Sequence, residues 1–466
     1  MNPVFQTVRE LAEAVRTRRL SPVALVETVL ARLETLGPRY NAVVTVTRER
    51  ALAQARRAEG EIAAGHWRGP LHGIPYGAKD LLATAGGIPT TWGAAPLREQ
   101  RFDFDATVVR RLEEAGAVLV AKLAMVELAG GMGYRQPNAS FTGPGISPWG
   151  TDAWSGGSSS GSGSAVAAGL VPFAIGSETW GSILSPAANC GVTGLRPTYG
   201  RVSRHGAMAL CWTLDKLGPL ALTADDCGLV LNAIAGPDPH DSTAADRPFR
   251  YDEADVDGRR FRFGVVRDVA ATAEPAVREA FARSLDVLAK IGTLDEVTLA
   301  DLPYEAITRT ILMAEAASAF EDMIESGAIA GLTAPEDHFT AYARDTILAK
   351  DYLRAQRLRA LVVREADRVL SRLDALVAPG RPGVASPLDR EFRSAARGNV
   401  ADLMGAIGNA AGLPAIAVPN GFSEAGLPTS LQFMGRAWGE NTILAAARAW
   451  QGITDFHRRH PPVEER

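Results

Sequence analysis

The sequence predicts an α/β protein, in which helices are layered against a largely buried β-sheet. Two observations lead to this class. After Gly69-Pro70, apolar segments of strand length alternate with longer segments that have helical periodicity. In addition, 46% of the 466 residues are hydrophobic and 22% are charged, as is usual for globular proteins with a substantial core.

The elements follow in order along the chain. Apolar residues at helical spacing predict two helices within residues 8–36, and Ser21-Pro22 is a typical cap and first residue for the second of them. A third helix, rich in alanine and arginine, is expected over residues 49–64. The alternating part then predicts helices over 107–115 and 276–291 and strands over 118–121, 173–175 and 261–266.

The last third of the chain changes character twice. Residues 302–373 contain few glycines and are expected to be mostly helical, whereas 377–379 predict a short strand and 405–444 predict further strands and a closing helix. Since no repeat and no clean linker is visible, we expect residues 1–466 to form a single domain. Its parts are N-terminal helices over about 1–65, a core over about 70–235 that should hold the catalytic residues, and a helical insertion over about 302–373.

Composition excludes several classes of protein. The net charge is −4 without a run of one sign, so we expect no nucleic-acid partner and no membrane partner. The longest apolar run, residues 165–175, is too short to cross a bilayer, and residues 1–20 are too charged for a secretory signal. The three cysteines and seven histidines show no metal-ligand spacing, so we expect reduced thiols, a cytoplasmic location, no metal and no cofactor.

Three segments could carry chemistry. Residues 155–164 are dense in glycine and serine, which is typical of a flexible linker, yet they lead directly into an apolar run, as a buried loop would. Ser182 follows Gly181, which lets the backbone turn so that several N–H groups could converge on a developing oxyanion. Lys79 ends a short apolar segment; most lysines are solvated, and lowering a lysine pKa from ~10.4 to near 7 costs about 4–5 kcal/mol.

Together and in this order, the three segments closely resemble the amidase signature family. The resemblance includes Lys79, the Gly-Gly-Ser-Ser loop that contains Ser158, and Gly181-Ser182. It continues almost from end to end through residues 69–75, 85–91, 105–110, 186–200, 215–219, 351–356, 412–416 and 426–432. The resemblance implies a single α/β/α domain with a large mixed β-sheet flanked by helices on both faces.

The resemblance also implies roles for the site residues. Ser182 is expected to be the nucleophile that forms an acyl-enzyme, Ser158 the bridging serine after a cis peptide, and Lys79 the base. Each consecutive pair should lie within hydrogen-bonding reach, because a serine hydroxyl is a weak nucleophile that needs a nearby base. The oxyanion hole and substrate contacts are expected at the backbone N–H groups of Thr179, Trp180, Gly181 and Ser182.

The expected activity is hydrolysis of a carbon–nitrogen bond in a small or medium amide by a stand-alone amidase. Two alternatives stay open: a carbamate- or urea-type hydrolase, and the A-type component of a tRNA-dependent amidotransferase, which releases ammonia from glutamine for a partner protein. Trp180 and Leu184 disfavour glutamine, because its site should be polar near the carbonyl. An inactive binding relative is disfavoured because all three catalytic positions are filled. The sequence leaves a homodimer open and does not determine the natural amide.

Two segments depart from the family pattern. Many members have aspartate, glycine and arginine where Glu178, Trp180 and Leu184 stand, so the usual acid–arginine contact is not expected here and the role of Glu178 is open. Polar residues that often precede Met125 are replaced by apolar ones. Together with Met132, this replacement fits either an apolar acyl pocket or ordinary core packing.

Overall fold

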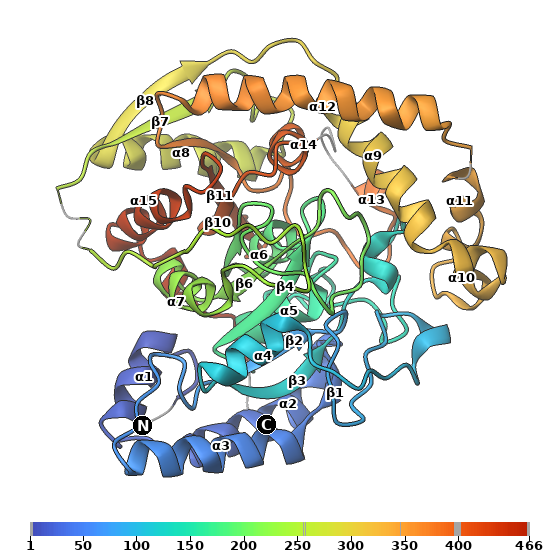
Figure 1. Cartoon of the computed structure of the whole chain (residues 1–466). Helices are drawn as coiled ribbons and strands as arrows, with labels where there is room; N and C mark the ends of the chain where they lie inside the picture. The colour runs from blue at the N-terminus through green and yellow to red at the C-terminus, as the bar shows by residue number, and fades with distance from the viewer. Residues whose placement is uncertain (1–2, 255, 257, 345, 396–401, 464–466) are drawn as a thin grey trace.

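The computed structural model describes residues 3–254, 256, 258–344, 346–395 and 402–463. Within them one mixed sheet has the strand order β1-β3-β2-β4-β6-β5-β10-β11-β9-β7-β8 (Figure 1). The strands are β1 (Val43–Val46), β2 (Pro75–Lys79), β3 (Val118–Leu123), β4 (Phe173–Glu178), β5 (Thr193–Arg196), β6 (Lys216–Ala221), β7 (Phe261–Val266), β8 (Gly292–Val297), β9 (Ala375–Pro379), β10 (Ala415–Phe422) and β11 (Pro428–Met434).

The sheet is parallel in two places and antiparallel elsewhere. β2 lies parallel to both β3 and β4, and β7 lies parallel to both β8 and β9. The pairs between these groups are antiparallel. Every residue of β2, β3 and β4 is buried, which explains why these strands are continuous rather than alternating apolar runs.

The helices account for most of the remaining chain. They are α1 (Val8–Arg16), α2 (Pro22–Leu36), α3 (Arg48–Ala63), α4 (Thr107–Glu114), α5 (Ser160–Ala167), α6 (Leu184–Cys190), α7 (Ala224–Ile234), α8 (Pro275–Ile291), α9 (Tyr304–Ala319), α10 (Glu321–Glu325), α11 (Asp337–Arg344), α12 (Ala349–Leu370), α13 (Phe392–Ala395), α14 (Leu403–Ala410) and α15 (Glu440–Gly452). As the sequence predicts, Ser21 caps α2 by accepting a hydrogen bond from the Ala24 N–H at 3.1 Å.

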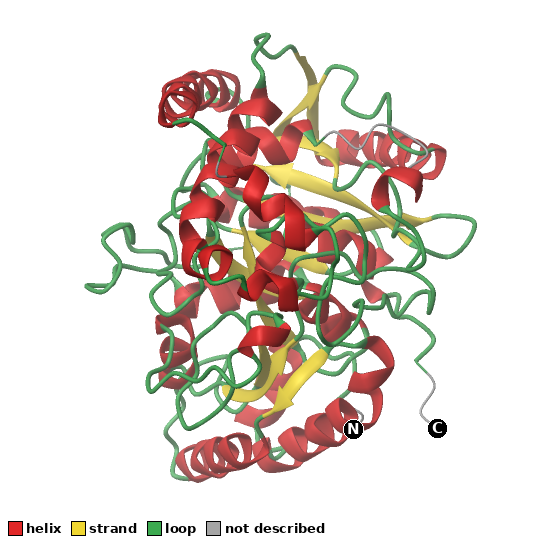
Figure 2. Ribbon diagram, turned by 90° about the vertical axis from the view of Figure 1, so that its right-hand side faces the viewer, coloured by secondary structure: helices red, strands yellow, loops and turns green. Residues whose placement is uncertain are grey.

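Helices cover both faces of the sheet, so the predicted fold class is confirmed (Figure 2). Along one face α4, α7, α15 and α8 follow one another, each in contact with the next, while α5 and α6 pack together against the other face. The sheet gathers strands from residue 43 to residue 434, which supports the proposal of a single domain. None of the helices in the described ranges combines the length and the apolar character needed to cross a membrane.

Two predicted segments are wrong in detail. Residues 160–167 of the glycine- and serine-rich tract are helical, because α5 is wholly buried and packs closely: a Cβ on Gly161 would collide with backbone atoms of Ala42 and Ala124. Residues 403–410 are also helical where strands are expected, and Asp402 caps this helix by accepting from the Gly405 N–H at 2.8 Å. Five strands, β1, β2, β5, β6 and β8, have no counterpart among the segments predicted from the sequence.

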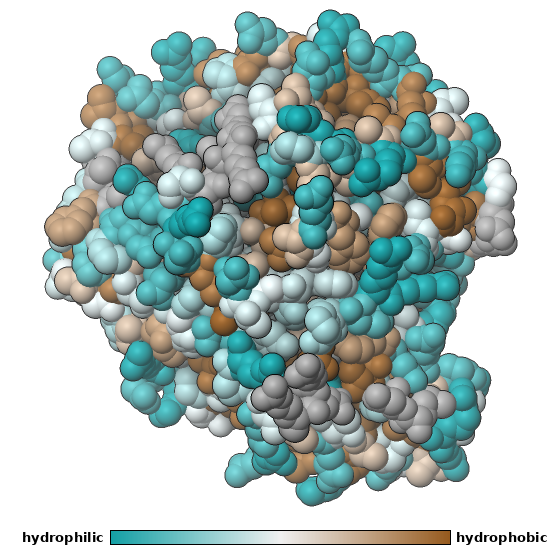
Figure 3. Space-filling model, turned by 180° about the vertical axis from the view of Figure 1, so that it is seen from behind, coloured by the Kyte–Doolittle hydropathy of each residue, from teal (hydrophilic) through white to brown (hydrophobic). Residues whose placement is uncertain are grey.

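The surface is mixed in polarity. Seen from behind, hydrophilic residues are interspersed with apolar ones over the visible face (Figure 3). The largest exposed apolar side chains of the helical region belong to α11 and to the start of α12, where Phe339 is 74% and Leu353 is 60% exposed.

Candidate active site

Lys79 lies where two parallel strands end. It is the last residue of β2, and β4 runs parallel beside it, so the carboxyl ends of both strands meet at one edge of the sheet. The Lys79 Nζ donates to the Ser158 Oγ at 2.7 Å and to the Ser177 Oγ at 2.9 Å. The first contact agrees with the sequence prediction. Ser177 was missed, and its only signal was a polar residue at the end of an apolar strand.

Burial makes Lys79 a suitable base. Its side chain is 0% exposed. Burial holds the pKa of the amine well below its ordinary value, and the more distant carboxylates Asp215 and Glu178 offset only part of this effect. The neighbouring Asp80 does not pair with Lys79; it forms an ion pair with Lys122 at 3.0 Å, and both of those side chains are fully buried. Burial therefore favours the neutral amine of Lys79, the form that can accept a proton.

Ser158 belongs to a buried loop rather than to a linker. The Gly157–Ser158 peptide is cis, as expected, and Ser158 is 1% exposed. The Ser159 N–H donates to the Ser182 carbonyl at 3.2 Å, which joins this loop to the nucleophile turn. Within the described chain, however, no hydrogen bond connects the hydroxyls of Ser158 and Ser182, so this expected link is not formed. Such catalytic hydrogen bonds often tighten only in the substrate complex.

Ser182 lies in the turn between β4 and α6. Gly181 has φ +83°, a left-handed conformation that glycine adopts without strain. Among the residues that the structure describes, the N–H groups of Thr179, Trp180, Gly181 and Ser182 have no acceptor, and the Thr179 hydroxyl donates to Asp215. Consecutive free N–H groups are the arrangement that binds a developing oxyanion.

The role of Glu178 becomes visible in the structure. Its Oε2 accepts from the N–H groups of Ile183 and Leu184 at 2.9 and 3.0 Å, and its Oε1 lies 2.7 Å from the Arg196 Nη1. An acid–arginine contact therefore does form, with Arg196 of β5 rather than with position 184. Burial alone would raise the pKa of Glu178, but Arg196 and Lys216 outweigh it and the pKa is lowered, so Glu178 is a carboxylate.

Helix α14 braces the same turn. The Asn409 Oδ1 accepts from the Lys216 Nζ at 2.7 Å, and the Asn409 Nδ2 donates to the Glu178 Oε1 at 3.3 Å. Burial, aided by Arg196, lowers the pKa of Lys216 to about 7. At the other end of α14, Asp402 accepts a hydrogen bond from the Trp180 Nε1 at 3.1 Å. The segment around Ser182 is thus held from both ends of one helix.

The pocket that contains Ser182 is charged rather than apolar. It measures about 270 Å³, includes Thr179 and Trp180, and its charged lining residues are Glu305, Arg309, Arg381 and Asp402. In the described ranges neither arginine forms a hydrogen bond or an ion pair, although Arg309 lies over the Trp180 ring at 5.5 Å. No motif marks these four residues, which lie more than a hundred positions from Ser182.

This pocket corrects two expectations. Met125 and Met132 are 0% exposed, belong to the main core and do not line the pocket, so the core-packing interpretation of that segment holds. Leu184 is also buried and absent from the lining, and the Trp180 indole presents its N–H to a carboxylate. The objection that residues 180 and 184 make the site too apolar for glutamine therefore does not hold.

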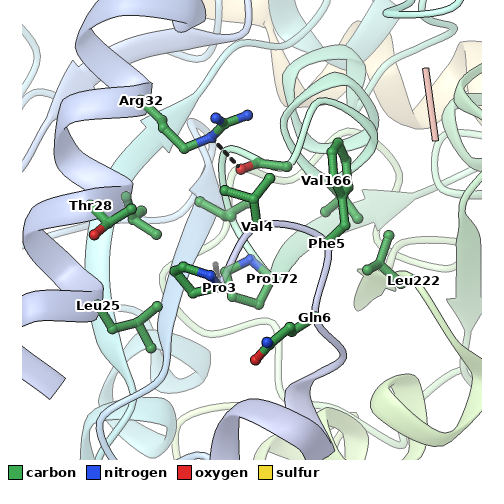
Figure 4. Close-up of a pocket in the computed structure, with 13 residues that line it drawn as sticks. Pro3, Val4, Phe5, Gln6, Leu25, Thr28, Arg32, Val166, Pro172 and Leu222 are labelled. Atoms are coloured by element: carbon green, nitrogen blue, oxygen red, sulfur yellow. Dashed lines mark hydrogen bonds between the residues drawn. The ribbon is translucent and has the colours of Figure 1, made fainter. Parts of the chain in front are cut away.

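A second hollow lies far from these residues. It is formed between the N-terminal segment and α2, where the Arg32 Nε donates to the Gly169 carbonyl at 3.0 Å (Figure 4). Pro3, Phe5 and Leu25 are among the residues that line it. Its volume is about 20 Å³, which is room for roughly one water molecule. The catalytic pocket is therefore the better candidate for substrate binding.

The family follows from comparison with known proteins. A family model described as amidase matches residues 24–444, and the chain belongs to the amidase family. It is an amidase-family hydrolase that acts on carbon–nitrogen bonds, and the resemblance seen in the sequence is confirmed.

Relatives of two kinds match over nearly the whole chain. The A-type component of the glutamyl-tRNA(Gln) amidotransferase of Roseiflexus sp. (strain RS-1) is 38% identical over 98% of this chain and 99% of its own length. The peptide amidase from Stenotrophomonas maltophilia has 32% identity and a TM-score of 0.85, covering 98% of each chain. The corresponding amidotransferase component from Thermotoga maritima has 28% identity and a TM-score of 0.82, covering 100% of this chain and 99% of its own. The amidotransferase relatives favour the amidotransferase alternative, whereas the peptide amidase fits a stand-alone amidase.

Proposed function

We propose that the chain hydrolyses the side-chain amide of glutamine, as the A-type component of an amidotransferase would. The observation that carries this proposal is the pocket around Ser182, which has two arginines without an ion-pair partner in the described ranges and two carboxylates. Glutamine has an α-carboxylate, which Arg309 and Arg381 can bind, and an α-ammonium group, which Glu305 and Asp402 can bind. The amidotransferase relatives support the same substrate.

The proposed chemistry uses the contacts around Lys79. The Ser182 Oγ attacks the amide carbon while its proton passes through the Ser158 hydroxyl to the neutral Lys79 amine. The free N–H groups of the turn at residues 180–182 donate hydrogen bonds to the oxyanion. The carbon–nitrogen bond then breaks, Lys79 returns the proton through Ser158 to the leaving nitrogen, and ammonia departs. A water molecule cleaves the acyl-enzyme by the same relay and frees Ser182.

The test measures ammonia released by the purified chain from three matched amides. The amides are glutamine, 4-carbamoylbutanoate, which lacks the α-ammonium group, and 4-aminobutanamide, which lacks the α-carboxylate. Glutamine should be hydrolysed fastest of the three. R381Q should raise KM for glutamine by about 10–200-fold, because it removes one charge-assisted contact of about 1.5–3 kcal/mol. KM for 4-aminobutanamide, which has no α-carboxylate, should not change. R267Q, a change at a 58%-exposed arginine that lines neither this pocket nor the cleft beside it, is the control. Equal rates for all three amides would refute glutamine recognition.

A second candidate is a stand-alone amidase for larger amides. A cleft of about 860 Å³ adjoins the catalytic pocket, which is more space than glutamine needs, and the structural likeness to a peptide amidase favours this candidate. Peptide amides of one to three residues, assayed with no other protein present, distinguish the two. Faster hydrolysis of these amides than of glutamine would favour the amidase. If the chain is an amidotransferase component, as first proposed, we expect it to lie in the cytoplasm and to assemble with further proteins.

A further inference from the structure

The catalytic pocket and the larger cleft meet at a narrow set of side chains. Three residues, Tyr134, Trp180 and Arg381, line both the pocket of about 270 Å³ and the cleft of about 860 Å³. Each hollow also reaches a catalytic loop: the pocket reaches Ser182, and the cleft reaches Gly157, next to Ser158. An amide bound at Ser182 that extends into the cleft must therefore pass these three side chains.

The Trp180 indole is fixed at this junction by three contacts. Its Nε1 donates to the Asp402 Oδ2 at 3.1 Å, the Arg309 guanidinium lies over its ring at 5.5 Å, and part of the ring packs on the main core. Asp402 is itself fixed, because it caps α14 through the Gly405 N–H at 2.8 Å and its own N–H donates to Glu305 at 2.6 Å. The indole is held as a wall and not as a free side chain.

Tyr134 is a second aromatic residue at this junction. Its ring meets Trp154 and Phe392 edge to face, with centroids 6.1 and 5.6 Å apart. Two glycines leave the space that it occupies, since a Cβ on Gly130 or on Gly157 would meet the tyrosine ring or its hydroxyl. Both aromatic side chains are therefore packed in place where the two hollows meet.

We propose that Trp180 is a specificity-determining residue that separates one long binding channel into two and confines substrates to small amides. The proposal rests on the proposed function only in placing the scissile amide at Ser182. A ligand pocket for drug-sized molecules usually measures about 300–1,000 Å³. The catalytic pocket alone lies below this range, whereas the joined hollows would exceed it. Removal of the indole should therefore convert a small-amide site into one for extended acyl groups.

The test uses covalent labelling of Ser182, which needs no knowledge of the natural amide. Labelling rates are compared for an ethyl fluorophosphonate and a dodecyl fluorophosphonate. W180A and W180G should raise the ratio of long-chain to short-chain rates by about tenfold or more, the range that one apolar pocket contact commonly controls. W180F keeps a smaller aromatic ring and loses the bond to Asp402, so its ratio should lie between that of the native chain and that of W180A. W212A, a change at an exposed tryptophan outside both hollows, is the matched control.

The outcomes separate the two proposals. An unchanged ratio in W180A and W180G, or a native chain that accepts both probes equally, overturns the partition and leaves the Ser182 hydrolase intact. Failure of both probes to label the native chain at Ser182 overturns the proposed function and the partition with it. Because alanine lacks the added backbone freedom of glycine, agreement between W180A and W180G attributes the change to the lost indole.

Discussion

Replacing Glu178 by glutamine tests whether this buried carboxylate positions the nucleophile. The Glu178 and Arg196 side chains are 0% and 1% exposed and lie 2.7 Å apart, so E178Q leaves a buried guanidinium without its counter-charge. Breaking such a pair costs about 3–5 kcal/mol. In the native chain, the N–H groups of Ile183 and Leu184 both donate to the Glu178 Oε2. A glutamine nitrogen in the place of this oxygen could accept from neither of them. The loss is large against a total stability of about 5–15 kcal/mol.

The same substitution should slow the chemistry. Ser182 precedes the two N–H groups that Glu178 holds, so a shift of that turn moves the nucleophile relative to Ser158. A misplacement of about 1 Å can reduce turnover by about a hundredfold. The change should appear in kcat and in the rate of fluorophosphonate labelling, with KM nearly constant, because Glu178 does not line the pocket.

Urea unfolding and labelling rates measure the two effects. E99Q is the control, since Glu99 is 86% exposed and should change stability by no more than about 0.5 kcal/mol. In the double variant E178Q/R196M both charges are gone, so its stability should exceed the value expected from adding the two single losses. The reasoning is refuted if E178Q matches E99Q in both assays, or if the double variant is as unstable as the sum of the single ones.

Three further predictions follow from the site. S182A should abolish turnover and remove the fluorophosphonate adduct, as intact-protein mass would show; an adduct at another serine would contradict the assignment. Burial lowers the pKa of Lys79 and the neutral amine is the base, so kcat/KM should fall as the pH drops through that lowered pKa and level off above it. Because Lys79 is coupled to two serines, the apparent pKa belongs to the cluster. Activity should also survive dialysis against a chelator, whereas a loss that zinc restores would count against the serine mechanism.

The amino-acid sequence alone predicts the class of fold and the family, both of which are confirmed, and it proposes three catalytic positions. These are local signals: apolar periodicity marks the buried strands, and Lys79, Ser158 and Ser182 each stand in a short segment whose composition is unusual. Thus β7 was predicted at its observed bounds, and α4 and α8 to within one residue at each end.

The burial and the hydrogen-bond partners of the site residues depend on the three-dimensional fold. Whether Lys79 is neutral depends on burial by strands from elsewhere in the chain, and its second partner, Ser177, comes from β4. Arg196 and Asn409 reach Glu178 from positions 18 and 231 residues away, so no local pattern could pair them. Propensity likewise misassigned α5, because close packing against Ala42 and Ala124 outweighs the helix-breaking tendency of glycine. Contacts between distant segments are fixed by the fold, and a local sequence pattern does not contain them.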